Sequence, residues 1–428
     1  MEAAILFGVF ILMIIFAMPL AFAMGAAGCL AVLLDGQVDI LGVIPRIFAG
    51  MNSVSMMAVP FFILSGSIME AGNISKQLVN FSKALVGHLT GGLAHVCVVS
   101  CMMFAAVSGS SVATALAFGN ILVPAMNKNG YDKSFTATLQ ACGGTIGPII
   151  PPSILMVMYC SVAGISVGAM FMAGVIPGIL MGVALMVVSY FYAKKNNIPR
   201  EEKMPLGEKL RTVFDAFWAL LMPVIIIWGT LSGICSPSEA GMLACVYGLI
   251  VGKFLYKGLK FKDLPEVFGK GAMSGATILA LTGFANIMGW QLARVNFPQM
   301  VTGFISGITS NPYGVITIVV IFLLILGMFM ETCAATVIFA PVLYPLANQF
   351  GIDPIQFGLI IVFTLVIGQV TPPVGVLLST TSSLLGVPMH STFKYLKPCF
   401  ASLLVVLLLC MFVEPISTFL PNLIFGAA

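Results

Sequence analysis

Charged residues are scarce in this chain of 428 residues. Asp, Glu, Lys and Arg make up 8% of the sequence and hydrophobic residues make up 60%, whereas an ordinary soluble domain carries roughly 25% charged residues. This shortage excludes a soluble globular protein, and no nucleic-acid partner is expected. The apolar runs predict about ten helical spans of about 20 residues each, which indicates an all-α polytopic protein of the lipid bilayer.

Signals for catalysis are also missing. The ten cysteines are dispersed without a CxxC pair, and the three histidines have no acid or cysteine at metal-ligand spacing. No GxxxxGK[ST] loop is present to bind ATP, and no GxSxG elbow is present to carry a nucleophile. We therefore expect neither an enzyme nor a histidine or cysteine metal centre.

Two stretches of the sequence match each other at a constant spacing of 221 residues (343 − 122, for example). The matched residues are mostly Pro, Gly, Asn and Asp, which shape the backbone rather than face lipid. They are Leu122, Pro124, Asn127, Gly130, Asp132, Gly147, Pro151 and Pro152, paired with Leu343, Pro345, Asn348, Gly351, Asp353, Gly368, Pro372 and Pro373. Helix breakers at matching places in two halves point to the binding sites of a secondary transporter.

The basic residues predict an orientation in the membrane. The most polar segment, residues 194–211, is placed in the cytoplasm by the positive-inside rule. Counting crossings from that segment leaves only Arg46 and Arg294 on the outside among 19 basic residues. This asymmetry supports the predicted multi-pass topology.

Two apolar segments do not fit a simple crossing. Residues 92–126 are interrupted at 108–111, and residues 315–346 are interrupted at 331–333, so each is expected to form a re-entrant helical hairpin. In the predicted topology the first hairpin opens to the cytoplasm and the second to the outside, which makes the repeats inverted. Because non-helical backbone at membrane depth must be buried in protein or line a wet cavity, we expect the two tips to meet near the midplane.

A span broken by a Pro-Pro pair follows each hairpin, at about 134–160 and about 354–381. The chain is predicted to divide into residues 1–50 (scaffold spans and an arm helix), 51–193 (transport repeat 1), 194–270 (cytoplasmic loops and scaffold spans) and 271–428 (transport repeat 2 and a C-terminal span). Amphipathic segments at 41–50, 75–86, 262–270 and 298–306 are expected to lie in the membrane interface.

The unwound backbone at these breaks suits a cation and an anion together. Freed carbonyls carry partial negative charge that suits Na⁺, and helix N-termini carry partial positive charge that suits a carboxylate. We predict a first Na⁺ cage from Ser108, Ser110, Gly147, Ile150 and Pro152, the last two through their backbone carbonyls. A second cage is predicted from Glu331, Thr332, Gly368, Thr371 and Pro373, and the substrate site from Ser111, Thr145 and Thr332.

The residues predicted for the two cages and the substrate site also have purely structural interpretations. A Pro-Pro pair can kink a span, and Ser or Thr can bond to carbonyls of its own helix. Glu331 is an acid predicted near the midplane, where ionisable groups are costly and usually functional, but it can also bond to the backbone of its own hairpin.

Four runs carry a resemblance to a known family: GSSVATALAFGNILVPAM (residues 109–126), GGTIGPIIPPS (143–153), ETCAATVIFAPVLYPL (331–346) and GQVTPPVG (368–375). They resemble the large membrane (M) subunit of tripartite ATP-independent periplasmic (TRAP) transporters, and the resemblance covers essentially the whole chain. It implies the ion-transporter fold, an elevator mechanism, coupling to two or more Na⁺ ions and a place in the bacterial inner membrane.

The resemblance also implies partners. These are a small four-helix membrane (Q) subunit and a periplasmic substrate-binding (P) protein that delivers an acidic small molecule, of the C4-dicarboxylate or sialic acid type. The sialic acid branch is the most similar. Some sialate transporters fuse the two membrane subunits, whereas this chain starts at the large one, so a separate small subunit is expected beside a scaffold of residues 1–34 and 214–251.

Functions other than that of a TRAP transporter subunit are compatible with parts of this sequence. The closest alternative keeps the fold and removes the partners, as a self-sufficient Na⁺- or H⁺-coupled anion carrier of the same superfamily. A channel or an intramembrane hydrolase belongs to a different class, and the absence of a nucleophile with a partnered base argues against the hydrolase.

Overall fold

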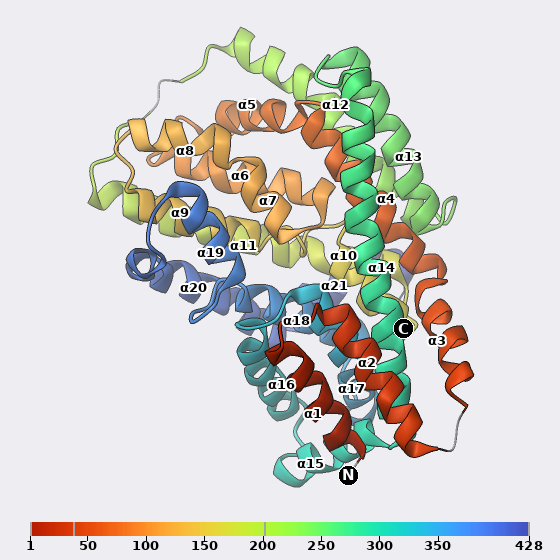
Figure 1. Cartoon of the computed structure of the whole chain (residues 1–428). Helices are drawn as coiled ribbons and strands as arrows, with labels where there is room; N and C mark the ends of the chain where they lie inside the picture. The colour runs from red at the N-terminus through yellow and green to blue at the C-terminus, as the bar shows by residue number, and fades with distance from the viewer. Residues whose placement is uncertain (1, 37–38, 201–202, 427–428) are drawn as a thin grey trace.

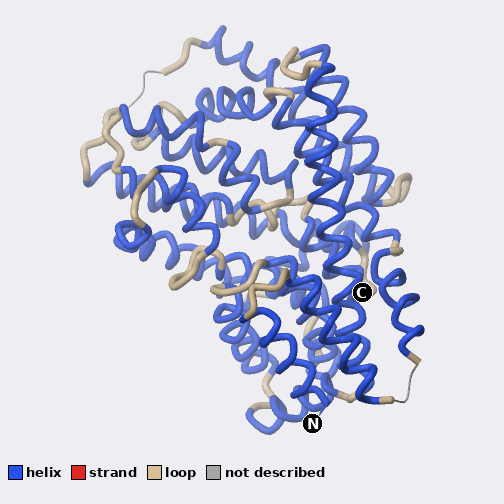
Figure 2. Tube along the Cα trace, viewed as in Figure 1, coloured by secondary structure: helices blue, strands red, loops and turns tan. Residues whose placement is uncertain are grey.

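The computed structural model describes residues 2–36, 39–200 and 203–426, and all regular secondary structure in these residues is helical (Figure 2). Seven of the described helices are long and apolar enough to cross a membrane, or eight if a bent pair counts as one more span. Shorter apolar helices accompany them. The predicted all-α, multi-span architecture is confirmed.

One group of helices is built around α14 (Leu264–Arg294), the long helix on the right of Figure 1. α14 packs against α2 (Leu20–Asp35), α3 (Val43–Met51) and α4 (Val54–Ala71), and α4 packs against α13 (Pro237–Ile250), which pairs with α12 (Leu206–Leu231). A Cβ atom at Gly275 of α14 would lie 3.0 Å from the Cβ atom of Pro60 on α4. Small residues permit such close approach in membrane proteins. We refer to these six helices as the α14 bundle.

The remaining helices contain the two duplicated units. In the first unit, α6 (Gly92–Ser108) turns into α7 (Ser111–Ala117) and α8 (Gly119–Lys128), and the broken span follows as α9 (Lys133–Gly144) and α10 (Ile154–Ala163). In the second, α16 (Pro312–Gly327) turns into α17 (Thr332–Phe350), and the broken span follows as α18 (Pro354–Gly368) and α19 (Val376–Leu385).

Connecting helices complete the chain: α1 (Glu2–Ile15), α5 (Ile74–Val86), α11 (Val167–Lys195), α15 (Phe297–Ile308), α20 (Met389–Phe412) and α21 (Pro415–Phe425), with short turns at Ile40–Gly42, Val251–Leu255 and Phe261–Asp263. Figure 1 shows the first hairpin in the upper half of the molecule and the second in the lower half.

The sequence duplication reappears in the way the helices are capped. Asp132 caps α9 by accepting from the amide of Ser134 at 2.7 Å, and Asp353 caps α18 by accepting from the amide of Ile355 at 2.8 Å. Both capping residues and both donors differ by 221 (353 − 132 and 355 − 134). A side chain at this position satisfies an amide that the helix leaves unpaired, so both repeats start their broken span by the same chemistry.

Helix breaks lie at 109–110, 145–153, 328–331 and 369–375. The break in the second hairpin shares only Glu331 with the predicted interruption at 331–333, because α17 already begins at Thr332. The amphipathic segment 262–270 is continuous with the span that follows it, because its residues from Leu264 onward form the start of α14. The only proline there, Pro265, stands in the first turn, where proline does not break a helix. The place of this segment in the membrane interface stays a prediction. The segment at 298–306 lies in α15, which is bent by 118° from α16.

The division of the chain into four parts stays a prediction. The contacts of α4 and α14 bear on the predicted boundaries between these parts. α4 falls within the predicted first transport repeat and most of α14 within the second, yet both pack together in the α14 bundle.

Cysteine labelling tests the predicted inversion. Lys128 and the matched end of the second hairpin at Asn348 are both exposed. We expect a single cysteine at Lys128 to react with an impermeant maleimide only from the cytoplasm, and one at Asn348 only from outside. Reaction of both from one face would contradict inverted repeats.

Candidate substrate and ion site

The tip of the first hairpin is a turn held by hydroxyl groups. Gly109 has a left-handed backbone (φ +60°), and Ser110 caps α7 by accepting from the amide of Ala113 at 3.4 Å. The Thr114 hydroxyl donates to the Ser110 carbonyl at 2.7 Å and lies 2.8 Å from the Ser108 hydroxyl. Several oxygens of this turn therefore lie within hydrogen-bonding distance of one another.

The first helix break packs directly on this tip. A Cβ atom at Gly147 would lie 2.6 Å from the Ser110 carbonyl oxygen, and one at Gly109 would lie 2.7 Å from the Pro152 carbonyl oxygen. Only glycine permits such close backbone contact. The structure therefore brings together four of the five residues predicted for the first cage: Ser108, Ser110, Gly147 and Pro152.

Two other predicted residues have side chains that pack elsewhere. The side chain of Ile150, which is predicted to act only through its backbone carbonyl, packs against α11, where a Cβ atom at Gly178 would lie 2.3 Å from it. Thr145 is fully buried, and its hydroxyl donates to the Cys142 carbonyl of its own helix at 2.5 Å. Neither Ile150 nor Thr145 lines the cavity described below.

The second hairpin tip carries an acid in place of the first tip's serine. Glu331 corresponds to Ser110 (331 − 110 = 221) and caps α17 by accepting from the amide of Ala334 at 3.1 Å. Its other carboxylate oxygen accepts from the Thr332 hydroxyl at 3.2 Å. The structure thus shows the capping interaction that the sequence left open, and the carboxylate still lines the cavity.

The second break is more open than the first. Gly368 packs on the end of α16, where its Cβ atom would lie 2.6 Å from the Cα atom of Gly327. Thr371 donates its hydroxyl to a carbonyl of the preceding helical turn at 2.9 Å, and Pro373 is exposed. Neither Thr371 nor Pro373 lines the cavity that the second tip lines.

One buried amide joins the two tips. The Ser111 hydroxyl donates to Oε1 of Gln369 at 2.6 Å, and Nε2 of Gln369 donates to the Thr332 hydroxyl at 3.3 Å. Gln369 is 1% exposed. Sequence reasoning missed this residue and also Thr114. A usable signal existed for Gln369, since a polar side chain inside a membrane span is costly and usually functional.

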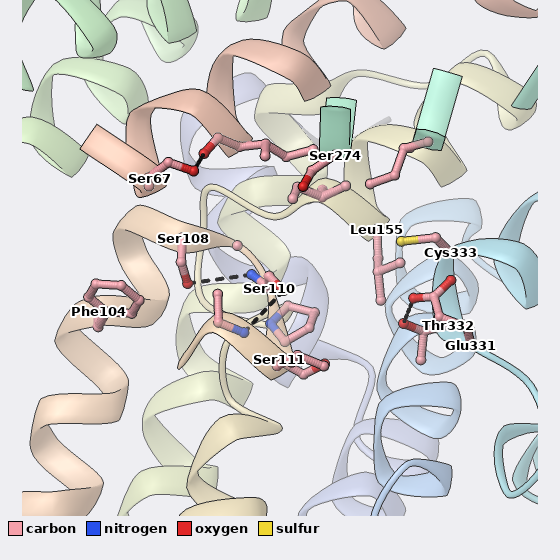
Figure 3. Close-up of a pocket in the computed structure, with 18 of the residues that line it drawn as sticks. Ser67, Phe104, Ser108, Ser110, Ser111, Leu155, Ser274, Glu331, Thr332 and Cys333 are labelled. Atoms are coloured by element: carbon pink, nitrogen blue, oxygen red, sulfur yellow. Dashed lines mark hydrogen bonds between the residues drawn. The ribbon is translucent and has the colours of Figure 1, made fainter. Parts of the chain in front are cut away.

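A cavity of about 350 Å³ separates the two tips from the α14 bundle (Figure 3). The first tip contributes Ser108 to Ala113, and the second contributes Glu331, Thr332 and Cys333. From the opposite side come residues of α4 and α14, among them Ser67, Glu70, Ser274 and Ile278. The two hairpin tips thus line one cavity, as the sequence predicted.

The charge on the cavity wall is unusual for an anion site. Helices α7, α10 and α17 begin there, with Ser111, Ile154 and Thr332 in the wall, and helix N-termini carry partial positive charge. None of the described residues that line the cavity is Lys, Arg or His, whereas Glu70 and Glu331 are acids. An anion held here therefore depends on helix dipoles, hydroxyls and any bound cation.

Comparison with known proteins identifies the family. The model of the DctM component of tripartite ATP-independent periplasmic transporters matches residues 7–416. The chain belongs to this family. It is therefore a TRAP transporter permease component and not an enzyme, and the family's description as tripartite makes it one part of a three-part system.

Curated TRAP permeases are similar over nearly the whole chain. The C4-dicarboxylate large permease DctM of Pseudomonas aeruginosa is 37% identical over 94% of both chains. The sialic acid large permease SiaM of Vibrio cholerae is 34% identical over 96% of both. The isethionate permease DctMQ of Oleidesulfovibrio alaskensis is 38% identical over 97% of this chain and 66% of its own length.

The fold also resembles that of a solved transporter. The crystal structure of YdaH from Alcanivorax borkumensis aligns with a TM-score of 0.61 over 88% of both chains, at 14% sequence identity. At this identity the likeness concerns the fold alone.

Proposed function

We propose that this TRAP permease carries out Na⁺-coupled uptake of an organic acid anion delivered by a periplasmic binding protein. The relatives named for C4-dicarboxylates and for sialic acid are 37% and 34% identical to it. Because these values are so close, the proposal covers the sialic acid and C4-dicarboxylate types together. The permease acts in the bacterial inner membrane beside a small four-helix subunit, which contacts residues 1–34 and 214–251.

The wall of the central cavity is the observation that supports Na⁺ coupling. A carboxylate placed between Ser111 and Thr332 meets helix N-termini and hydroxyls but no basic side chain among the described lining residues, and two acids lie in the same wall. Bound cations would compensate the negative charge of the substrate and of the two acids. The oxygens of Ser108, Ser110 and Pro152, gathered where the first tip meets the first break, provide a place for one of them, and binding of ion and substrate is then coupled by charge.

An elevator movement fits the position of the cavity. It lies between the hairpin tips and the helices α4 and α14, so access to it changes when the tips move past those helices. Opening by separation of the tips would expose backbone groups of the breaks to lipid, which costs several kcal/mol for each unpaired group. We therefore assign the α14 bundle, including α4, to the static part and the hairpins with their broken spans to the moving part.

Reconstitution tests the proposed function. We expect radiolabelled substrate to accumulate in proteoliposomes only when the permease, its small subunit and the binding protein are all present and Na⁺ is higher outside. Accumulation by the permease alone would favour the self-sufficient carrier instead. Equilibration without accumulation, independent of any ion gradient, would indicate a channel.

Replacing Ser108 and Ser110 together by Ala tests the first Na⁺ site. We expect the Na⁺ concentration for half-maximal uptake to rise about tenfold, because losing hydrogen-bonding oxygens costs on the order of 1 kcal/mol. The control is Ser189→Ala/Ser402→Ala, which removes two hydroxyls bonded only within their own helices. An unchanged Na⁺ dependence in the folded Ser108/Ser110 variant would refute this site.

A further inference from the structure

A second large cavity lies away from the hairpin tips, with a volume of about 780 Å³. It is bounded by the turn between α5 and α6, by one face of the C-terminal half of α11, and by Arg200 and Lys203. The lining residues used below are His88, Thr90, His95, Val183, Val187, Phe191, Arg200 and Lys203. Neither the central cavity nor the proposed transport cycle uses them.

Positive charge gathers at one end of this cavity. Arg200 and Lys203 lie in its wall together with His88, and no acid lies there among the described residues. The two acids between them in sequence, Glu201 and Glu202, lie outside the described residues. This end belongs to the segment that the positive-inside rule places in the cytoplasm, where the membrane surface is rich in anionic lipid.

An apolar wall continues from the basic end. Val183, Val187 and Phe191 are 50%, 49% and 63% exposed and are spaced four residues apart on α11. Their spacing puts them on one helix face that extends about 12 Å, since each helical residue rises about 1.5 Å. A phosphate ion would leave this wall uncovered. A lipid matches both parts, with its phosphate at the basic end and an acyl chain along α11.

His95 adds a polar group at the inner wall of the same cavity. It is 4% exposed, and its Nε2 lies 3.0 Å from the Thr90 carbonyl oxygen. A carbonyl only accepts hydrogen bonds, so Nε2 carries the proton and Nδ1 is left as an acceptor. Nδ1 is buried without a hydrogen-bond partner in the described structure. Because Nδ1 itself is buried, it does not face the cavity, and His95 serves only as part of the wall.

We propose that this cavity binds the headgroup of an anionic phospholipid of the cytoplasmic leaflet, of the phosphatidylglycerol type. Arg200 and Lys203 hold its phosphate, and Val183, Val187 and Phe191 hold the start of an acyl chain. The site lies where α11 connects to the α14 bundle through α12. The lipid-site proposal depends on the membrane topology and not on Na⁺ coupling or on the transported substrate. It can therefore fail while the proposed transport function holds, and the reverse is also true.

Native mass spectrometry of the permease with its small subunit tests the site. Phosphatidylglycerol and phosphatidylcholine with identical acyl chains are added separately, and the lipid retained by the complex is measured. We expect preferential retention of phosphatidylglycerol. The variant Arg200→Gln/Lys203→Gln should weaken it by roughly thirtyfold, since each basic residue near an anionic lipid surface adds to the attraction.

Two further variants separate a built site from general surface charge. Lys260→Gln/Lys262→Gln removes two exposed charges from the same predicted side of the membrane but outside this cavity, and it should retain the lipid as the unmodified protein does. Val187→Trp fills the apolar wall and leaves every charge in place. It should lose the lipid while keeping an unchanged melting temperature.

Three results would overturn the assignment. The first is equal retention of the two lipids, and the second is an equal effect of the Arg200/Lys203 and Lys260/Lys262 variants. The third is displacement of phosphatidylglycerol by equimolar glycerol phosphate, which would mark a site for a free phosphate ester rather than for a lipid.

Discussion

A disulfide between positions 289 and 341 should abolish uptake, and reduction should restore it. Gly289 lies on α14 and Pro341 on α17, and a Cβ atom at Gly289 would lie 3.9 Å from the Cβ atom of Pro341. This separation suits a disulfide, whose Cβ atoms are about 3.8 Å apart. The pair Gly289→Cys/Pro341→Cys is made in a background without the ten native cysteines.

The expected loss is large because the bond joins the two parts that must move past each other. If the hairpins carry substrate and ions past α4 and α14, a covalent link from α17 to α14 stops the cycle in one state. Uptake in proteoliposomes should fall by at least about twentyfold on oxidation, limited by the fraction of protein that remains uncrosslinked.

A crosslink within the static part is the matched control. A Cβ atom at Gly229 of α12 would lie 3.8 Å from the Cβ atom of Ala240 on α13, so Gly229→Cys/Ala240→Cys forms a bond of the same geometry inside the α14 bundle. Transport should continue when this bond is formed. Full transport with the 289–341 bond formed quantitatively would rule out the elevator and require a fixed site with gates.

Replacing Gln369 by Leu should reduce uptake at low substrate concentration by about ten- to a hundredfold. The amide accepts from Ser111 and donates to Thr332, and leucine of similar size leaves both hydroxyls without this partner. A buried polar group that loses its partner costs about 1–3 kcal/mol. Because the two tips would no longer be held in register, the effect should appear mainly in the substrate concentration for half-maximal uptake.

Gln356→Leu controls for the loss of a buried amide in α18, the helix that ends directly before Gln369. Gln356 donates to the Cys410 carbonyl at 2.9 Å and does not line the central cavity. This variant should lower thermal stability while leaving the substrate dependence of uptake unchanged. Wild-type kinetics in Gln369→Leu, at normal expression, would show that the amide plays no part in substrate binding.

The helix breaks and hairpin turns were predictable from sequence because their causes are local. Proline removes a backbone donor wherever it stands, and the turn at Gly109 has the positive φ that glycine favours. The constant spacing of 221 then transferred each local inference from one repeat to the other. The contact between the tip of the first hairpin and the first helix break was also predictable, because both are unwound segments of the same repeat.

Contacts between distant residues escaped the sequence reasoning. Gln369 lies 258 residues from Ser111 and 37 from Thr332, and nothing in the flanking sequence marks those partners. The duplication did not mark Gln369 either, because the residue at the matching position of the first repeat is Pro148 (369 − 221), which has no polar side chain. Thr145 illustrates the opposite case, in which a hydroxyl suited to substrate bonds to its own helix instead.

Cryo-electron microscopy of the permease with its small subunit, Na⁺ and a bound substrate anion tests the central claim most directly. We expect density for the anion between the two hairpin tips, with its carboxylate within about 3 Å of hydroxyl groups of Ser111 or Thr332. Ion density is expected where Ser108, Ser110 and Pro152 meet. An anion bound elsewhere while the space between the tips holds only water would contradict it.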